Sequence, residues 1–185
     1  NVINLDAFNL DKVLEMDPEF LNTEGEHLHD DRVTSVSSRF EGEMNFTMLR
    51  MYIQDLIGNL ETASNLFRYK GVLAVKGMKS KFVFQGVHMI FSGGFVDTNK
   101  WRKGETRECR FVFIGRKLDK DSLIGGFEDC KAEETLRFKE GDKVQANIGT
   151  WVDGVILKQW DEGNPYRIQL QDGKQTNVWG PIDSD

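Results

Sequence analysis

Apolar residues between positions 32 and 131 recur with two different periods, and each period predicts one kind of element. Alternating apolar residues predict strands at about 32–40, 67–76, 81–91 and 107–115. Phe46, Leu49, Ile53 and Leu60 recur at steps of three and four, which predicts an amphipathic helix over about 45–60. A second helix is expected at about 119–130. The order predicts an α+β fold with helices on one face of a mainly antiparallel sheet.

Two further features refine this sheet. The run 107–115 is apolar on both sides, with Phe111 and Phe113 facing one way and Val112 and Ile114 facing the other. Such a strand is expected to be central and to have both faces covered. The stretch 92–106 contains Gly93-Gly94, polar residues and Gly104, so we predict a loop there.

A second, smaller unit is predicted from about residue 136 onward. Short strands at 144–147, 151–160, 166–170 and 176–179 are separated by turn signals at 161–164 and 172–173. The spacing predicts a small all-β barrel, and its motifs resemble those of SH3-like and Tudor-like barrels. We therefore divide the chain into residues 1–31, 32–135 and 136–185.

Composition and charge exclude several classes of function. The net charge of −6 disfavours a nucleic-acid partner, because phosphates are bound mainly by cations. No apolar stretch is long enough to predict a membrane span. Two cysteines, Cys109 and Cys130, cannot form a disulfide framework, so we expect an intracellular, cytoplasmic protein, with an organelle left open.

Three motifs point to a known family. They are R-x-K-G at 68–71, Q-G-V-H at 85–88 and I-G-R-x-L-D at 114–119. Together they resemble the C-terminal domain of CobW-type metallochaperone GTPases, closest to the zinc-chaperone branch. The resemblance implies that residues 1–21 are the tail of a GTPase domain and that 22–31 form a linker.

This chain has no nucleotide-binding motif of its own. GTP hydrolysis uses a phosphate-binding loop of the form G-x-x-x-x-G-K-[ST], which the sequence lacks. We therefore expect no enzymatic activity and no cofactor in this chain. The resemblance implies GTP, Mg²⁺ and zinc for the parent protein, and two partners: its own GTPase domain and a metal-requiring client protein.

One pair of histidines is a candidate metal site. His27 and His29 lie in an acidic run, and imidazole with carboxylates suits Zn²⁺. The alternative is a solvated spacer without metal.

Four residues of the family motifs are candidates for protein interaction. Arg68 and Lys70 share one face of a predicted strand, and His88 and Arg116 end two others. Basic side chains on neighbouring strands could bind a carboxylate-bearing partner. Internal ion pairs, and a hydrogen-bonded histidine at a strand end, are the alternatives.

Aromatic residues gather in the small unit. A cage for a methylated Lys or Arg could be built from Trp151, Trp160, Tyr166 and Trp179. The alternative is that these side chains form the core of the unit.

Taken together, the sequence predicts the non-catalytic half of a GTP-dependent metal chaperone, which docks to its GTPase domain or to a client. A stand-alone interaction module, or a structural subunit that binds a peptide through the barrel, is the alternative.

Overall fold

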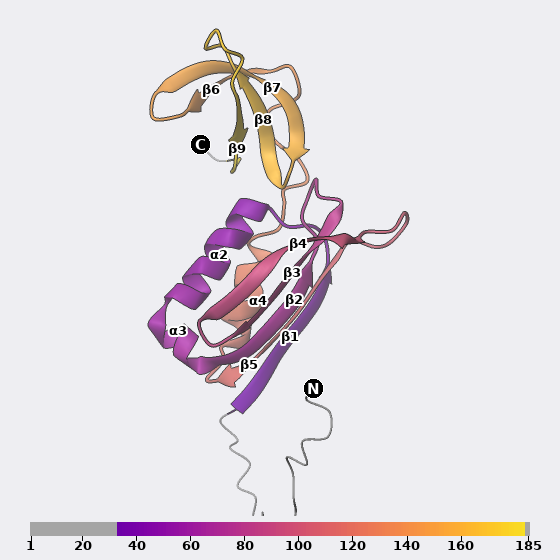
Figure 1. Cartoon of the computed structure of the whole chain (residues 1–185), viewed down its shortest axis with the longest axis vertical. Helices are drawn as coiled ribbons and strands as arrows, with labels where there is room; N and C mark the ends of the chain where they lie inside the picture. Colours follow the sequence, from indigo (N-terminus) through magenta and orange to yellow (C-terminus); the bar gives the residue numbers. More distant parts are fainter. Residues whose placement is uncertain (1–32, 184–185) are drawn as a thin grey trace, which may run out of the picture. The chain divides into compact units, whose positions relative to one another are not determined.

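The structure, a computed structural model, describes residues 33–183. Its first part is a five-stranded antiparallel sheet of order β1-β5-β2-β3-β4, accompanied by three helices (Figure 1). The elements are β1 (Val33–Glu41), α2 (Phe46–Gly58), α3 (Leu60–Asn65), β2 (Leu66–Leu73), β3 (Ser80–Val87), β4 (Ile90–Lys100), β5 (Glu108–Arg116) and α4 (Lys120–Glu128). This confirms the predicted α+β class.

Helix α2 forms where its apolar period predicted it. Leu49, Ile53 and Leu56 are buried on one side of the helix. The Asn45 side chain caps the start by accepting hydrogen bonds from the backbone N–H groups of the first turn. Asn59 ends α2 and caps the short helix α3, which the sequence analysis did not predict.

The helix-covered face of the sheet is packed with aromatic rings. Tyr69, Phe84 and Phe113 are all buried there, and the rings of Tyr69 and Phe113 stack with centroids 5.6 Å apart. Gly71 and Gly86 make room for these rings: Gly71 pairs with Phe84 across β2 and β3, and Gly86 pairs with Tyr69. A Cβ atom at Gly86 would lie 2.1 Å from Tyr69 Cζ. Glycine is therefore the residue that lets each ring cross the neighbouring strand.

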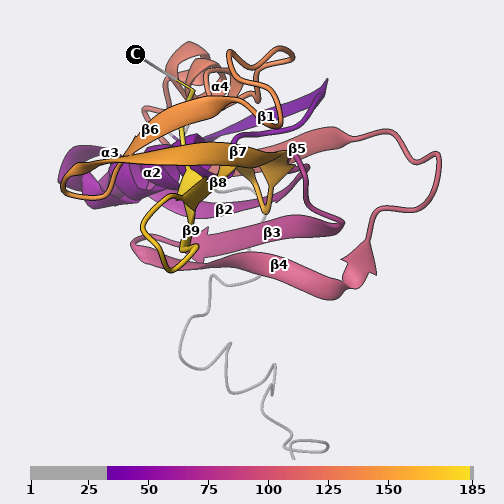
Figure 2. The same ribbon diagram turned by 90° about the horizontal axis from the view of Figure 1, so that it is seen from above.

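One predicted loop is instead a strand. The stretch 92–106 was expected to be irregular, but β4 runs from Ile90 to Lys100 and pairs with β3 (Figure 2), so the prediction holds only for 101–106. The chain reverses before the predicted loop begins, at His88, whose φ is 51°. Because this turn contains no glycine, it gave no sequence signal, and Gly93-Gly94 was mistaken for the break.

Strand β5 lies inside the sheet, between β1 and β2, as predicted. The expectation that both of its faces are covered is wrong for the described residues. Phe111 and Phe113 are buried under the helices, whereas Val112 is only partly buried and Ile114 is 37% exposed. A strand with an apolar pattern on both sides thus leaves one side open.

The second part is a separate four-stranded antiparallel sheet of order β6-β7-β8-β9. Its strands are β6 (Lys143–Asn147), β7 (Trp151–Asp161), β8 (Asn164–Leu170) and β9 (Asn177–Gly180), close to the predicted positions. Ile156, Ile168 and Leu170 lie in its core. The predicted closed barrel is not confirmed, because β6 and β9 are the two edges of an open sheet.

Hydrogen bonds also connect this sheet with the start of α2. The backbone N–H of Phe46 donates to the Gly163 carbonyl at 3.1 Å. The Asn45 side-chain amide donates to the Pro181 carbonyl at 3.2 Å. Asn45 is one of two buried polar residues of the described part. Its side chain pairs with backbone N–H groups at the start of α2 and with the Pro181 carbonyl, so these polar groups do not lack hydrogen-bond partners.

Candidate functional site

The face of the five-stranded sheet opposite the helices is the candidate site, and we call it the open face. Its side chains are those that alternate with the buried ones along each strand. They include Ser35, Ser37, Arg39, Glu41, Arg68, Lys70, Val72, Lys81, Val83, Gln85, Val87, Ile90, Ser92, Glu108, Arg110, Val112, Ile114 and Arg116.

The strand register arranges the open face in rows that mix apolar and cationic side chains. In one row, Arg68 lies between Ile114 and Val87, and Val87 is followed by Ile90. In the next row Lys70 lies beside Val112. Arg68 and Lys70 therefore each have an apolar neighbour on the next strand.

Two of these cations have no internal partner. Within residues 33–183, neither Arg68 nor Lys70 forms an ion pair or a side-chain hydrogen bond. By contrast, Arg39 and Arg110 both contact Glu108, at 2.7 and 3.2 Å. Arg68 and Lys70 are thus available to an anionic group from outside this part of the chain.

Shallow hollows lie on the open face around Lys70. One, of about 450 Å³, is lined by Lys70, Val72, Val83 and Arg110 among others. Another, of about 320 Å³, is lined by Arg68, Lys70 and Ile90 among others. Lys70 borders both, so the unpaired cations line a continuous stretch of surface with an apolar floor.

The other two motif residues, His88 and Arg116, lie near each other at the end of the sheet that is next to Arg68. The His88 ring lies 5.6 Å from the Phe67 ring, and the Arg116 guanidinium lies 5.4 Å from the same ring. The structure thus brings Arg68, His88 and Arg116 to one end of the sheet around Phe67. Their role in binding stays a prediction.

The β3–β4 hairpin adds an apolar tip at this end. Val87, Met89 and Ile90 are 52%, 60% and 77% exposed. Met89 and Ile90 were missed by the sequence analysis, because the turn at His88 was placed inside a longer strand. The signal available was the run of apolar residues on both sides of His88.

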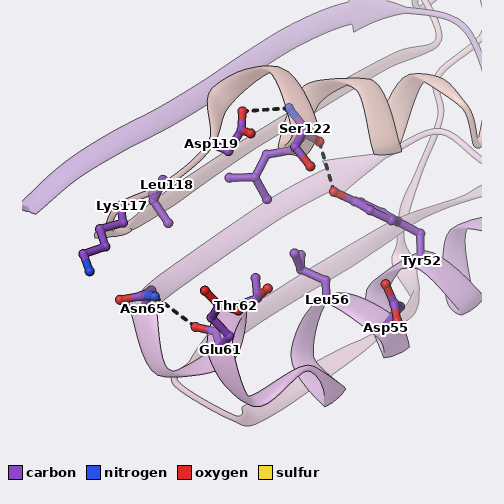
Figure 3. Close-up of a pocket in the computed structure, with 11 residues that line it drawn as sticks. Tyr52, Asp55, Leu56, Glu61, Thr62, Asn65, Lys117, Leu118, Asp119 and Ser122 are labelled. Atoms are coloured by element: carbon purple, nitrogen blue, oxygen red, sulfur yellow. Dashed lines mark hydrogen bonds between the residues drawn. The ribbon is translucent and has the colours of Figure 1, made fainter.

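A more enclosed pocket lies elsewhere, between α2, α3 and the start of α4 (Figure 3). It has a volume of about 260 Å³, and its polar groups serve local structure. Asp119 caps α4, Asn65 donates to the Glu61 carbonyl and the Tyr52 hydroxyl donates to the Leu123 carbonyl. Burial raises the pKa of Tyr52 to about 12, so this hydroxyl is neutral.

Three of the four proposed cage aromatics share a hollow in the second sheet. Trp151, Tyr166 and Trp179 line a hollow of about 280 Å³, whereas Trp160 does not line it. Tyr166 is buried, and its hydroxyl accepts a hydrogen bond from the Phe138 backbone. The Arg167 guanidinium already lies 4.2 Å from the Trp179 ring. The cage stays a prediction.

Metal binding has no support within the described residues. His27 and His29 lie outside them, so their role stays a prediction. Residues 33–183 contain no group of three or more His, Cys, Asp or Glu side chains that could hold a metal ion. Burial raises the pKa of Cys109 and of Cys130 to about 11, which keeps both thiols protonated. In the same part of the chain, no helix is long and apolar enough to cross a membrane.

Comparison with known families identifies the first part of the chain. A sequence profile described as the cobalamin synthesis protein cobW C-terminal domain matches residues 33–131. This range covers the whole five-stranded sheet, its helices and the open face, and ends before the second sheet.

Comparison with individual proteins gives a distant relative. The chain is 26% identical over 130 residues to the zinc chaperone YjiA of Escherichia coli, covering 68% of this chain and 37% of that protein. The zinc-bound crystal structure of this E. coli GTPase shares the fold, with a TM-score of 0.50, 23% identity, and coverage of 56% and 31% of the two chains. A zinc-bound triple mutant of it gives the same values. The chain thus spans little more than a third of this relative's length.

Proposed function

The chain belongs to the family of CobW C-terminal domains, and from this premise we propose that it is the non-catalytic half of a GTP-dependent zinc chaperone. In this proposal the chain binds and does not catalyse. The GTPase half and its nucleotide, with Mg²⁺, belong to the parent protein, and zinc is the cargo. An intracellular location follows from the same role.

One observation carries the docking part of the proposal, namely the open face of the sheet. An apolar strand surface is stabilised when another element covers it, yet within residues 33–183 Val112 is only partly buried and Ile114 is 37% exposed. Arg68 and Lys70 add unpaired charge beside them. We infer that the GTPase half, or a client protein, covers this face.

A chimera tests this role. Residues 33–131 would replace the matching C-terminal part of the E. coli zinc chaperone, and thermal unfolding and GTP hydrolysis would be measured. We expect the two halves to unfold in one coupled transition, because docking stabilises both. Arg68→Glu/Lys70→Glu should separate the transitions.

The matched control for the chimera is Lys79→Glu/Lys103→Glu. Both lysines are exposed, lie in loops at the other end of the sheet and involve the same charge change. Continued GTP hydrolysis would show that the GTPase half is folded in each variant. Separate unfolding of the unaltered chimera would contradict the docking role.

Zinc handling by the linker is tested in the full chain. We propose that His27 and His29 take part in passing zinc, because imidazole is a common zinc ligand. Zinc should then raise the midpoint of thermal unfolding, and His27→Ala/His29→Ala should remove the shift. An equal shift in both proteins would exclude these histidines.

A second candidate function is a stand-alone peptide-binding module. It is favoured by the hollow in the second sheet, where Trp151 is 67% exposed and Trp179 is 45% exposed. This hollow lies outside residues 33–131, the range matched by the family.

A further inference from the structure

We propose that the element covering the open face is an acidic amphipathic helix of the partner. This inference rests on the proposed docking function and specifies the partner's chemistry. The carboxylates of this helix contact Arg68 and Lys70, and its apolar side chains cover the valine and isoleucine residues beside them.

Charge is the first argument. The chain as a whole has a net charge of −6, yet Arg68 and Lys70 on its open face have no carboxylate partner within the described part, residues 33–183. Arg110, in the next row, shares the single carboxylate of Glu108 with Arg39. A cationic patch on an acidic protein selects an anionic partner and repels a basic one. A second copy of this face would bring like charges together.

The apolar side chains are the second argument. Arg68 is flanked by Ile114 and Val87, and Lys70 is flanked by Val112. A nucleic acid would use the cations but would leave these aliphatic groups without a matching surface. A polypeptide that alternates carboxylate and aliphatic side chains satisfies both.

Geometry is the third argument. Arg68 and Lys70 are two residues apart on one strand, which separates them by about 6.6 Å. Residues four apart on a helix are about 6 Å apart along one side, so two carboxylates at that spacing can reach both cations together. A sheet face is also the surface on which helices pack in layered folds, whereas an added strand would use a sheet edge.

The experiment uses the full chain of 185 residues and a designed helical peptide as probe. The peptide has about 18 residues, long enough for a helix in isolation, with leucines on one side and glutamates four apart next to them. A matched peptide carries lysines in place of the glutamates. Binding is measured by fluorescence anisotropy, and the contact surface is mapped by amide chemical shifts.

We expect the glutamate peptide to bind with shift changes on β2, β3 and β5, and to weaken as ionic strength rises. Arg68→Glu/Lys70→Glu should weaken it by about tenfold or more. The control Lys79→Glu/Lys103→Glu should bind as the unaltered chain does. The charge-reversed chain should gain affinity for the lysine peptide, which shows that it is folded.

Several results would overturn the proposal. These are no binding, equal binding of the two peptides, shift changes confined to the second sheet or to the pocket of Figure 3, or equally tight binding of a single-stranded oligothymidylate. The chimera separates this inference from the proposed function. If the halves of the chimera unfold separately but the peptide still binds in a charge-specific way, docking to the GTPase half is rejected and the acidic-helix inference stands. If the halves unfold together but the chain shows no charge-specific peptide binding, the acidic-helix inference is rejected and docking stands.

Discussion

The two faces of the five-stranded sheet are made by the same strands but have opposite character. On the helix-covered face, Tyr69, Phe84 and Phe113 are buried and in contact with one another. On the open face, Arg68 and Lys70 lie among aliphatic side chains and have no partner among residues 33–183. The covered face holds the fold together, and the open face is left for recognition. Substitutions on the two faces should therefore separate stability from binding.

The largest effect is expected from removing a ring on the covered face. Phe113→Ala would leave a cavity among Tyr69, Phe84 and Phe127, and large-to-small changes of this kind cost about 3–5 kcal/mol. The neighbouring Ile114→Ala, on the open face, should cost about 1 kcal/mol or less. Urea unfolding measures both. Similar losses for the two variants would contradict the difference between the faces.

The next effect concerns the glycine that accommodates Tyr69. In Gly86→Ala the new methyl group would overlap the Tyr69 ring, whose Cζ atom is 2.1 Å from the Cβ position. Overpacking of this kind costs about 1–3 kcal/mol. Gly94→Ala is the matched control, because no heavy atom other than those of Gly94 and its two chain neighbours lies within 4 Å of its Cβ position. If both substitutions left the urea midpoint unchanged, the proposed ring-over-glycine packing would be refuted.

Alkaline pH should lower the free energy of unfolding through two buried thiols on the helix-covered side of the sheet. Burial raises the pKa of Cys109 and Cys130 from 9.0 to about 11. The unfolded thiols therefore release protons first, so the free energy of unfolding is unaffected below pH 9 and falls as the pH rises toward 11. Urea midpoints at neutral pH and at pH 9 to 11 test this, and Cys109→Ala/Cys130→Ala should reduce the fall. An unchanged fall would assign it to other groups, such as Tyr52.

These two faces also show how far the sequence could predict the molecule. The period of three to four residues identified α2 and α4, and the period of two identified β5, because the spacing of apolar residues indicates which side of an element is buried. The spacing of Arg68 and Lys70 placed them together on one side of β2. The turn at His88 was missed, because its left-handed backbone conformation is stabilised by the surrounding hairpin and not by a glycine.

The uncovered state of the open face could not be predicted for a different reason. The apolar pattern of Val112 and Ile114 indicates that these residues favour burial, but it does not indicate whether the covering element lies in the same chain. The expectation of coverage on both sides of β5 failed on this point. The failed expectation is informative, because it marks the surface where a partner is expected.

The smallest effect on stability should come from the residues most important for docking. Arg68→Ala/Lys70→Ala removes two side chains that have no partner in the part of the chain that the structure describes, so the free energy of unfolding should change by no more than about 0.5 kcal/mol. Arg110→Ala is the comparison within the same face, because it removes an ion pair with Glu108. Exposed pairs contribute about 0–1 kcal/mol, so this change should also be small. A loss above about 1 kcal/mol in the double variant would show that Arg68 and Lys70 support the fold, and the separation between the two faces would fail. A small loss, together with weaker binding of the acidic peptide, would place recognition on a surface that folding does not require.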